Sequence, residues 1–116
     1  MQNSFCWLQL QSTNAAEIKK FYTSLFDWKL SENPEKEHDY THIDTGEGPG
    51  GGIMQAEQGV PSHWMPYVQV EDINSYTQKA EKLGAQIIVA VTKIDTGGSF
   101  SIIKDPSGAN IGLYQS

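Results

Sequence analysis

The sequence repeats one pattern of residues at an interval of 58 positions. Each copy begins with a segment in which apolar and polar residues alternate, 5–11 in the first copy and 64–70 in the second, which predicts a strand. Each copy continues with a helix-capping residue, Asn14 or Asp72, followed by apolar residues at helical spacing. Because this interval is half of the 116-residue length, we expect two structural repeats that fill the chain.

We expect each repeat to contain a strand, a helix and three further strands. The later strands are predicted at Trp28–Ser31, Tyr40–Asp44, Ile53–Ala56, Gln86–Val91, Ser99–Lys104 and Asn110–Tyr114, with a charged loop at Asn33–Glu37 and a hairpin turn at 96–98. The repeat units are about 1–58 and 59–116, within a single domain of residues 1–116. This pattern predicts an α+β fold in which two βαβββ repeats form a curled mixed sheet, with helices outside and a ligand trough inside.

The helix boundaries are predicted from their end residues. Asn14 is a favourable N-cap, and Glu17 three residues later gives a spacing like that of a capping box. Asp27 stands after the first helix, where a left-handed backbone is expected, and Gly84 closes the second helix at its C′ position. The segment Ala15–Phe26 should therefore match Ile73–Gly84.

The first strand has two different faces. Cys6, Leu8 and Leu10 alternate with Trp7 and Gln9, so the apolar face should pack on the first helix and the other face is left free. In the second copy the corresponding free face carries Met65, Tyr67 and Gln69. We expect the functional residues on these free faces.

Composition excludes several classes of partner. The net charge is −6 and all eight basic residues are lysines, so nucleic acid and anionic membrane surfaces are poor partners. The lone cysteine, Cys6, predicts no internal disulfide, an inert core thiol and a reducing compartment. No apolar run reaches the ~20 residues of a membrane span, and the N-terminal segment lacks signal-peptide character. These features predict a cytoplasmic protein.

The glycine-rich stretch Thr45–Gly52 invites comparison with a phosphate-binding loop. However, no Gly-Lys-Ser/Thr sequence follows it and no helix is predicted to start there. We therefore expect this stretch to be a turn that leads into the next strand.

Four segments in this order resemble the vicinal-oxygen-chelate superfamily, which includes glyoxalase I, bleomycin-resistance proteins and extradiol dioxygenases. They are FYTSLFDW at 21–28, WMPYVQVEDI at 64–73, LGA at 83–85 and DPSGANIGLY at 105–114. The resemblance covers nearly the whole chain and is strongest to the branch of single-module, glyoxalase-like proteins. It implies the curled, two-repeat fold expected above.

The resemblance also implies a divalent metal ion held by His, Glu or Gln side chains, with two ligands in each repeat. Carried over to this sequence, the first-strand positions fall on Trp7 and Met65 and the last-strand positions on Met54 and Gly112. None of these side chains offers nitrogen or oxygen to a hard or borderline ion. We therefore predict no metal ligands and no cofactor, with a divalent metal as the alternative.

We predict that the chain binds a small organic molecule in the trough. The ligand-binding candidates are Trp7, Gln9, Met54, Met65, Tyr67, Gln69, Gly112 and Tyr114. The aromatic rings would stack on a flat ligand and the glutamines would orient it. The opposing interpretation is that these side chains only fill the interior or a dimer contact.

Two enzyme classes stay open beside a binding module. The first is a metal-dependent lyase, isomerase or dioxygenase with non-standard ligands such as His42 or His63. The second is a metal-free proton-transfer enzyme that uses one of these histidines. The lack of arginine weakens the glyoxalase I interpretation, since arginine would normally clamp the carboxylates of a glutathione adduct. We also expect a homodimer, because a short chain with edge strands needs to cover them.

Overall fold

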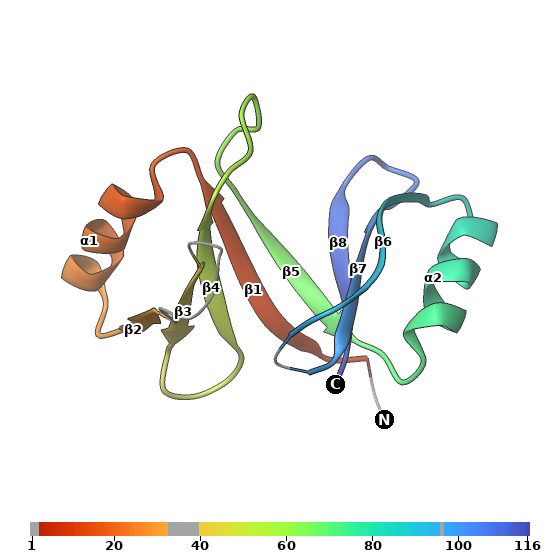
Figure 1. Ribbon diagram of the computed structural model, residues 1–116, viewed down its shortest axis with the longest axis horizontal. Helices are drawn as coiled ribbons and strands as arrows, with labels where there is room; N and C mark the ends of the chain where they lie inside the picture. The colour runs from red at the N-terminus through yellow and green to blue at the C-terminus, as the bar shows by residue number, and fades with distance from the viewer. Residues whose placement is uncertain (1–2, 33–39, 96) are drawn as a thin grey trace. The chain divides into compact units, whose positions relative to one another are not determined.

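The computed structural model describes residues 3–32, 40–95 and 97–116 (Figure 1). These residues form two compact units, one of residues 7–64 and one of residues 3–6 with 65–116. The predicted loop Asn33–Glu37 and Thr96 of the predicted hairpin lie outside the described residues. No helix of the described ranges has the length and apolar character needed to cross a membrane.

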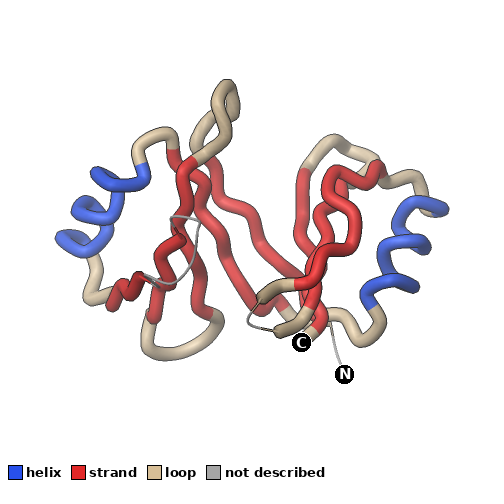
Figure 2. Tube along the Cα trace, viewed as in Figure 1, coloured by secondary structure: helices blue, strands red, loops and turns tan. Residues whose placement is uncertain are grey.

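The unit of residues 7–64 is one βαβββ repeat. Its elements are β1 (Phe5–Ser12), α1 (Ala15–Leu25), β2 (Lys29–Glu32), β3 (Tyr40–Asp44) and β4 (Gly50–Gln55). Its strands lie in the order β2-β3-β4-β1, with β1 and β4 parallel and the other pairs antiparallel. Helix α1 covers one face of these strands (Figure 2).

The second unit has the same architecture. Its elements are β5 (His63–Gln69), α2 (Ile73–Lys82), β6 (Gln86–Lys93), β7 (Ser99–Lys104) and β8 (Asn110–Gln115). The strand order β5-β8-β7-β6 repeats that of the first unit, again with the first and last strands parallel. The predicted α+β class with two βαβββ repeats is confirmed.

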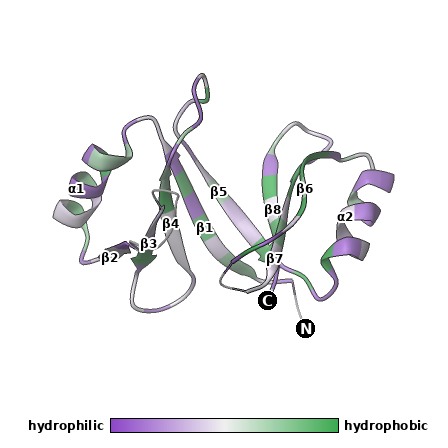
Figure 3. Ribbon diagram, in the orientation of Figure 1, coloured by the Kyte–Doolittle hydropathy of each residue, from purple (hydrophilic) through white to green (hydrophobic). Residues whose placement is uncertain are grey.

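Each unit has its own hydrophobic core between helix and strands. In residues 7–64 the core contains Leu10, Ala15, Ile43 and Ile53, so of the predicted apolar face of β1 only Leu10 packs in the core. Leu8 is 38% exposed and Cys6 is partly exposed, so the prediction was wrong for these two residues, including Cys6 as a core thiol. In the second unit the core contains Val70, Ile73 and Leu113. Figure 3 shows α2 as mostly hydrophilic, whereas hydrophobic residues concentrate in the strands. The core therefore occupies the helix-covered side of each set of strands.

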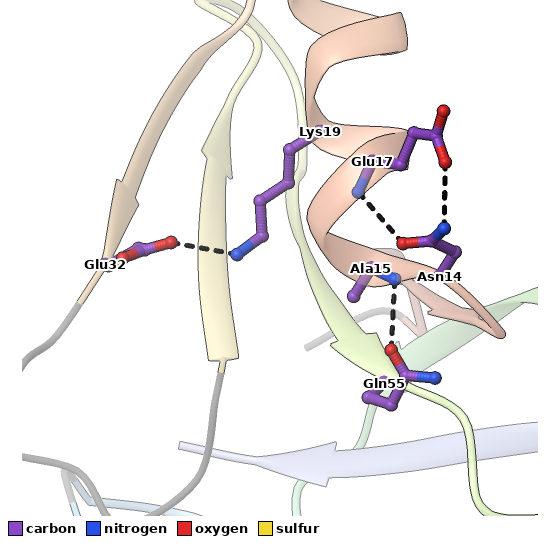
Figure 4. A network of polar contacts seen from close by, with 6 residues as sticks. All are labelled: Asn14, Ala15, Glu17, Lys19, Glu32 and Gln55. Carbon is purple, nitrogen blue, oxygen red and sulfur yellow. Dashed lines mark hydrogen bonds and ion pairs between the residues drawn. The ribbon is translucent and has the colours of Figure 1, made fainter.

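The start of α1 is fixed by side chains (Figure 4). Asn14 Oδ1 accepts a hydrogen bond from Glu17 N at 3.1 Å, and Asn14 Nδ2 donates to Glu17 Oε2 at 2.9 Å, which confirms the predicted cap. An ion pair of 2.8 Å between Lys19 Nζ and Glu32 Oε1 joins the helix to β2. Helix α2 is capped in the same way, because Asp72 Oδ1 accepts from Ser75 N at 3.3 Å.

The end of α1 differs from the prediction. No described residue other than glycine has a positive φ, so Asp27 is not left-handed. Phe26 leaves the helix directly in an extended conformation, with φ −123° and ψ 158°, while its N–H still bonds to Tyr22 O at 2.8 Å. This exit needs no left-handed residue. Gly84, in contrast, ends α2 with φ 104° as expected.

The interval between the repeats changes from 58 to 60 residues at the last strand. Gln9 pairs with Gly52, whereas Tyr67, which is 58 residues after Gln9, pairs with Gly112. The repeat mate of Gly112 is therefore Gly52, and its assignment to Met54 was wrong. The pairing of β6 with β7 contains two register shifts that place extra residues on β6 and lengthen the second repeat.

Two glutamines at the ends of β4 and β8 confirm this register. Gln55 Oε1 accepts a hydrogen bond from Ala15 N, the first residue of α1, at 3.1 Å (Figure 4). Gln115 Oε1 accepts from Ile73 N, the first residue of α2, at 2.8 Å. Each last strand thus satisfies one backbone donor at the start of its helix.

Candidate functional site

The free face of the 7–64 unit brings together five side chains from three strands. They are Trp7 and Gln9 of β1, Tyr40 and His42 of β3, and Met54 of β4. Because side chains alternate along a strand, these residues lie opposite the core residues Leu10, Ile43 and Ile53. We call this set the Trp7–Met54 cluster.

A chain of hydrogen bonds runs through the cluster. Trp7 Nε1 donates to Tyr40 Oη at 2.8 Å, and the Tyr40 hydroxyl donates to Gln9 Oε1 at 3.3 Å. Gln9 Nε2 then donates to Met54 Sδ at 3.4 Å. Three of the predicted ligand-binding residues, Trp7, Gln9 and Met54, are therefore connected, and Tyr40 is the residue that links the first two.

His42 contacts both aromatic rings of the cluster. Its ring centroid lies 5.7 Å from that of Trp7 and 5.3 Å from that of Tyr40, with interplanar angles of 74° and 69°. These are edge contacts, the favoured geometry for aromatic pairs. Tyr40 was missed in the sequence, although its position two residues before His42 on the same strand places both on one face.

One glycine of β4 makes room for an aromatic ring. A β-carbon on Gly52 would overlap the Tyr40 hydroxyl and ring, whereas one on Gly50 would meet the backbone oxygen of Ile43 at 2.9 Å and would only touch the Trp7 ring. The prediction that Thr45–Gly52 is only a turn was wrong, because residues 50–52 belong to β4. Gly52 lets the Tyr40 ring from the neighbouring strand lie on the β4 backbone.

Tyr40 is held in its neutral form. Burial raises the pKa of Tyr40 above the ordinary value of 10.0, and the hydrogen bond from Trp7 partly offsets this effect. Removing the hydroxyl from water disfavours the phenolate, so the hydroxyl hydrogen stays available for Gln9 near neutral pH.

The second unit shows a related arrangement on β5 and β8. Met65 and Tyr67 are 3% and 6% exposed, and Tyr67 pairs with Gly112. A β-carbon on Gly112 would overlap the Tyr67 ring, so this glycine also lies beneath a tyrosine. Gln69 pairs with Tyr114 one position further along the same face. All five residues predicted for this unit thus belong to two adjacent strands.

His63 has a local contact of its own. Its Nδ1 atom lies 2.9 Å from the carbonyl oxygen of Pro61, at the start of β5. This nitrogen is engaged by the preceding loop. Of the two histidines considered for proton transfer, His42 is the one that contacts other candidate residues.

A shallow depression of about 460 Å³ lies elsewhere in the 7–64 unit, beside the loop after β4. Thr13 and residues 55–61 line it, and none of the predicted ligand-binding residues does. The Gln55 side chain at its edge already bonds to Ala15 N and to Thr13 O. Its position therefore gives no support to a ligand site there.

The residues at the metal-ligand positions do not fit a divalent ion. With the corrected register, these positions are Trp7 and Gly52 in one unit and Met65 and Gly112 in the other. The indole N–H of Trp7 is a donor, the Met65 thioether is a soft ligand, and tyrosine rings fill the space above both glycines. Within the described ranges, no three His, Cys, Asp or Glu side chains group as metal ligands would.

Comparison with family models places residues 4–113 in the Glyoxalase/Bleomycin resistance protein/Dioxygenase superfamily. The chain belongs to this superfamily. Two curated relatives are "Putative glyoxylase CFP32" of Mycobacterium tuberculosis, 31% identical over 128 residues, and "Anthracycline biosynthesis protein DnrV" of Streptomyces peucetius, 24% identical over 125. Each alignment covers 94% of this chain but only 44% and 46% of the relative. The chain thus spans less than half the length of these superfamily members.

Solved structures show the same fold. The hypothetical protein BH1468 from Bacillus halodurans C-125 superposes with a TM-score of 0.74 at 14% identity, covering 100% of this chain and 96% of that one. Methylmalonyl-CoA epimerase from Mycobacterium tuberculosis gives 0.68 at 11%, covering 96% and 86%. A methylmalonyl-CoA epimerase in complex with methylmalonyl-CoA and NH4+ gives 0.69 at 13%, covering 100% and 96%. The resemblance inferred from the four sequence motifs is confirmed at the level of family and fold.

Proposed function

We propose that this superfamily member binds a small organic molecule at the Trp7–Met54 cluster, without a resident metal ion. The observation that carries this proposal is the hydrogen-bond chain from Trp7 through Tyr40 and Gln9 to Met54. Ligand sites commonly combine aromatic and apolar walls with a few polar groups of fixed orientation. The cluster has this composition, and its polar groups are held by one another before any ligand arrives.

The names of two relatives support the ligand class only. One solved relative contains methylmalonyl-CoA, and one curated relative is named for anthracycline biosynthesis. These names support an organic ligand of moderate size for this chain as well. For the second unit, taken by itself, we propose that Met65, Tyr67, Gln69, Gly112 and Tyr114 contact a ligand on that unit's own free face.

We propose a cytoplasmic homodimer as the working form. The strands β2 and β6 each lie at the end of their unit's strand order, and such edges are commonly covered by a partner. The chain's one cysteine, Cys6, is a free thiol, which suits a reducing compartment. Light scattering at micromolar concentration is expected to give twice the 12.9 kDa chain mass. A mass of one chain would contradict the dimer.

The binding proposal is tested by thermal denaturation against a library of neutral organic metabolites, after treatment with EDTA. A ligand at 100 times its Kd should stabilise the protein by about 2.7 kcal/mol. The stabilisation should fall in Trp7→Phe, which loses the first donor of the chain. The matched control is Trp64→Phe, because Trp64 packs against Trp28 and Tyr22 instead. A ligand that stabilises both variants equally would place its binding elsewhere.

A second candidate function is metal-free proton transfer by His42. The supporting observation is that His42, a residue type that commonly acts as a general acid or base, contacts Trp7 and Tyr40 on the free face. Once a ligand that is chemically changed has been found, turnover should be lost in His42→Gln. Turnover that persists in this variant, or that needs an added divalent ion, would exclude this mechanism.

A further inference from the structure

We infer that the Trp7–Met54 cluster selects neutral, planar ligands that carry a hydrogen-bond acceptor, and that Gln9 Nε2 donates the hydrogen bond. This inference rests on the proposed function, because it specifies the ligand class of the same site. It follows from the direction of each hydrogen bond in the cluster and from the charges around it.

The donor-to-acceptor direction of the hydrogen-bond chain is set by Trp7. An indole N–H can only donate, so Tyr40 Oη accepts from it and the Tyr40 hydroxyl hydrogen is directed to Gln9 Oε1. The opposite orientation of the Gln9 amide would point Oε1 at Met54 Sδ, with two acceptors facing each other. The Tyr40 hydroxyl hydrogen would then also lose its acceptor. The Gln9 amide nitrogen is therefore fixed on the side of Met54.

The last donor of the hydrogen-bond chain, Gln9 Nε2, has only a weak acceptor. Gln9 Nε2 carries two hydrogens, and its hydrogen bond among the described residues is the one to Met54 Sδ at 3.4 Å. A thioether is a poor acceptor compared with a carbonyl oxygen. Since Gln9 is only 8% exposed, water has little access to compensate. A ligand acceptor at this position would improve the hydrogen bonding of the cluster.

Met54 is able to give way to such a ligand. Its side chain is partly exposed, whereas Gln9 behind it is buried. A methionine side chain has three rotatable bonds and adapts readily to a new neighbour. Displacing the thioether exposes the amide N–H without breaking the bonds between Trp7, Tyr40 and Gln9. The donor would thus keep its orientation when the ligand binds.

The charges around the cluster favour a neutral ligand. None of its five side chains is an aspartate, glutamate, lysine or arginine, and burial raises the pKa of Tyr40, so its hydroxyl stays neutral. Further along β3 and β2, Asp44 and Lys29 are cross-strand partners, so charges of both signs lie there. A carboxylate bound at the cluster would lose its hydration without a lysine or arginine of the cluster to pair with it, and the nearby Lys29 already faces Asp44 across the strands. The planar shape follows from the Trp7 and His42 rings.

Three naphthalene probes of similar shape test the inference. 2-Acetylnaphthalene carries a neutral acceptor, 2-ethylnaphthalene carries none, and 2-naphthoate carries a negative charge. Binding is followed at pH 8 by the ¹H–¹⁵N signals of the Trp7 indole and the Gln9 side-chain amide, the latter assigned by its absence in Gln9→Met. We expect 2-acetylnaphthalene to bind about tenfold more tightly than either other probe, as one added hydrogen bond allows. Its binding should also shift the Gln9 amide signals.

Three variants test whether the Gln9 amide, rather than its neighbours, causes the preference for 2-acetylnaphthalene. Gln9→Met keeps a side chain of similar size without the donor. In this variant 2-acetylnaphthalene and 2-ethylnaphthalene should bind with about equal affinity. Met54→Leu removes the competing thioether and should preserve or increase that preference. The matched control is Gln11→Met, the next glutamine on the same face of β1, where the preference should be unchanged.

The outcomes separate this inference from the proposed function. If the Trp7 indole signal shifts with every probe at equal affinity, the selection for an acceptor is wrong while ligand binding at the cluster stands. Tighter binding of 2-naphthoate, or an unchanged preference in Gln9→Met, likewise overturns the inference alone. If no probe shifts the Trp7 or Gln9 signals, both the inference and binding at this cluster are contradicted.

Discussion

The ring of Tyr40 fills the space that a β-carbon on Gly52 would need. In the other unit, the ring of Tyr67 on β5 likewise fills the space that a β-carbon on Gly112 would need. Gly112 of β8 lies 60 residues after Gly52 of β4. Both glycines stand at positions where the family resemblance implies a metal-binding side chain. In this chain a tyrosine ring occupies that space in each repeat, and in the 7–64 unit the same tyrosine anchors the hydrogen-bond chain.

Gly52→Ala is expected to destabilise the protein by about 1–3 kcal/mol, because the added methyl group overlaps the Tyr40 ring. The measurement is urea denaturation of the single variants and of the double variant with Tyr40→Ala. Since the smaller side chain removes the overlap, the cost of Gly52→Ala should be much lower in the Tyr40→Ala background. Costs that simply add would show that the two residues do not compete for this space.

Gln55→Ala is expected to lower the free energy of unfolding by about 1 kcal/mol, because it removes the side-chain acceptor of Ala15 N at the start of α1. Gln115→Ala should have a similar effect at the start of α2, where Gln115 bonds to Ile73 N. The control is Gln58→Ala, at an exposed position in the loop after β4. Equal stability of all three variants in chemical denaturation would contradict the capping role.

The stability of the protein is expected to fall as the pH rises above about 10, partly because of Tyr40. Burial raises the pKa of Tyr40 in the folded state, so between its unfolded and folded pKa values the unfolded chain binds fewer protons. The contribution of Tyr40 to stability is fully present below its unfolded-state pKa of about 10 and is lost as the pH rises through its folded-state pKa. Tyr40→Phe should flatten this dependence when denaturation is followed from pH 8 to 11. An unchanged slope would contradict the burial of the hydroxyl.

Local sequence signals predicted much of the fold. Asn14 and Asp72 begin the helices because a side-chain acceptor at this position satisfies a free backbone N–H, whatever the rest of the fold. Leu10 reaches the core because side chains alternate along a strand. These signals depend on neighbouring residues only, and the sequence displays them directly.

Features that depend on strand pairing could not be predicted in the same way. The equivalence of Gly52 with Gly112 depends on extra residues accommodated in β6, which no motif marks. Tyr40 joins the cluster because β3 pairs with β4 and sets its ring above Gly52. The candidate residues of β1 were found from its faces, and Met54 of β4 was reached through the 58-residue offset that the register has since corrected. The residue that connects Trp7 to Gln9 required the structure.

The central claim, metal-free binding of an organic ligand at the Trp7–Met54 cluster, is tested most directly by calorimetric titration. The ligand that best stabilises the protein is titrated into protein purified without a histidine tag, before and after treatment with EDTA, and into Tyr40→Phe. We predict the same Kd with and without EDTA, less than one tenth of an equivalent of bound divalent metal, and about tenfold weaker binding in Tyr40→Phe, which loses the hydrogen bond that orients Gln9. One equivalent of zinc, nickel or iron whose removal abolishes binding would contradict the claim.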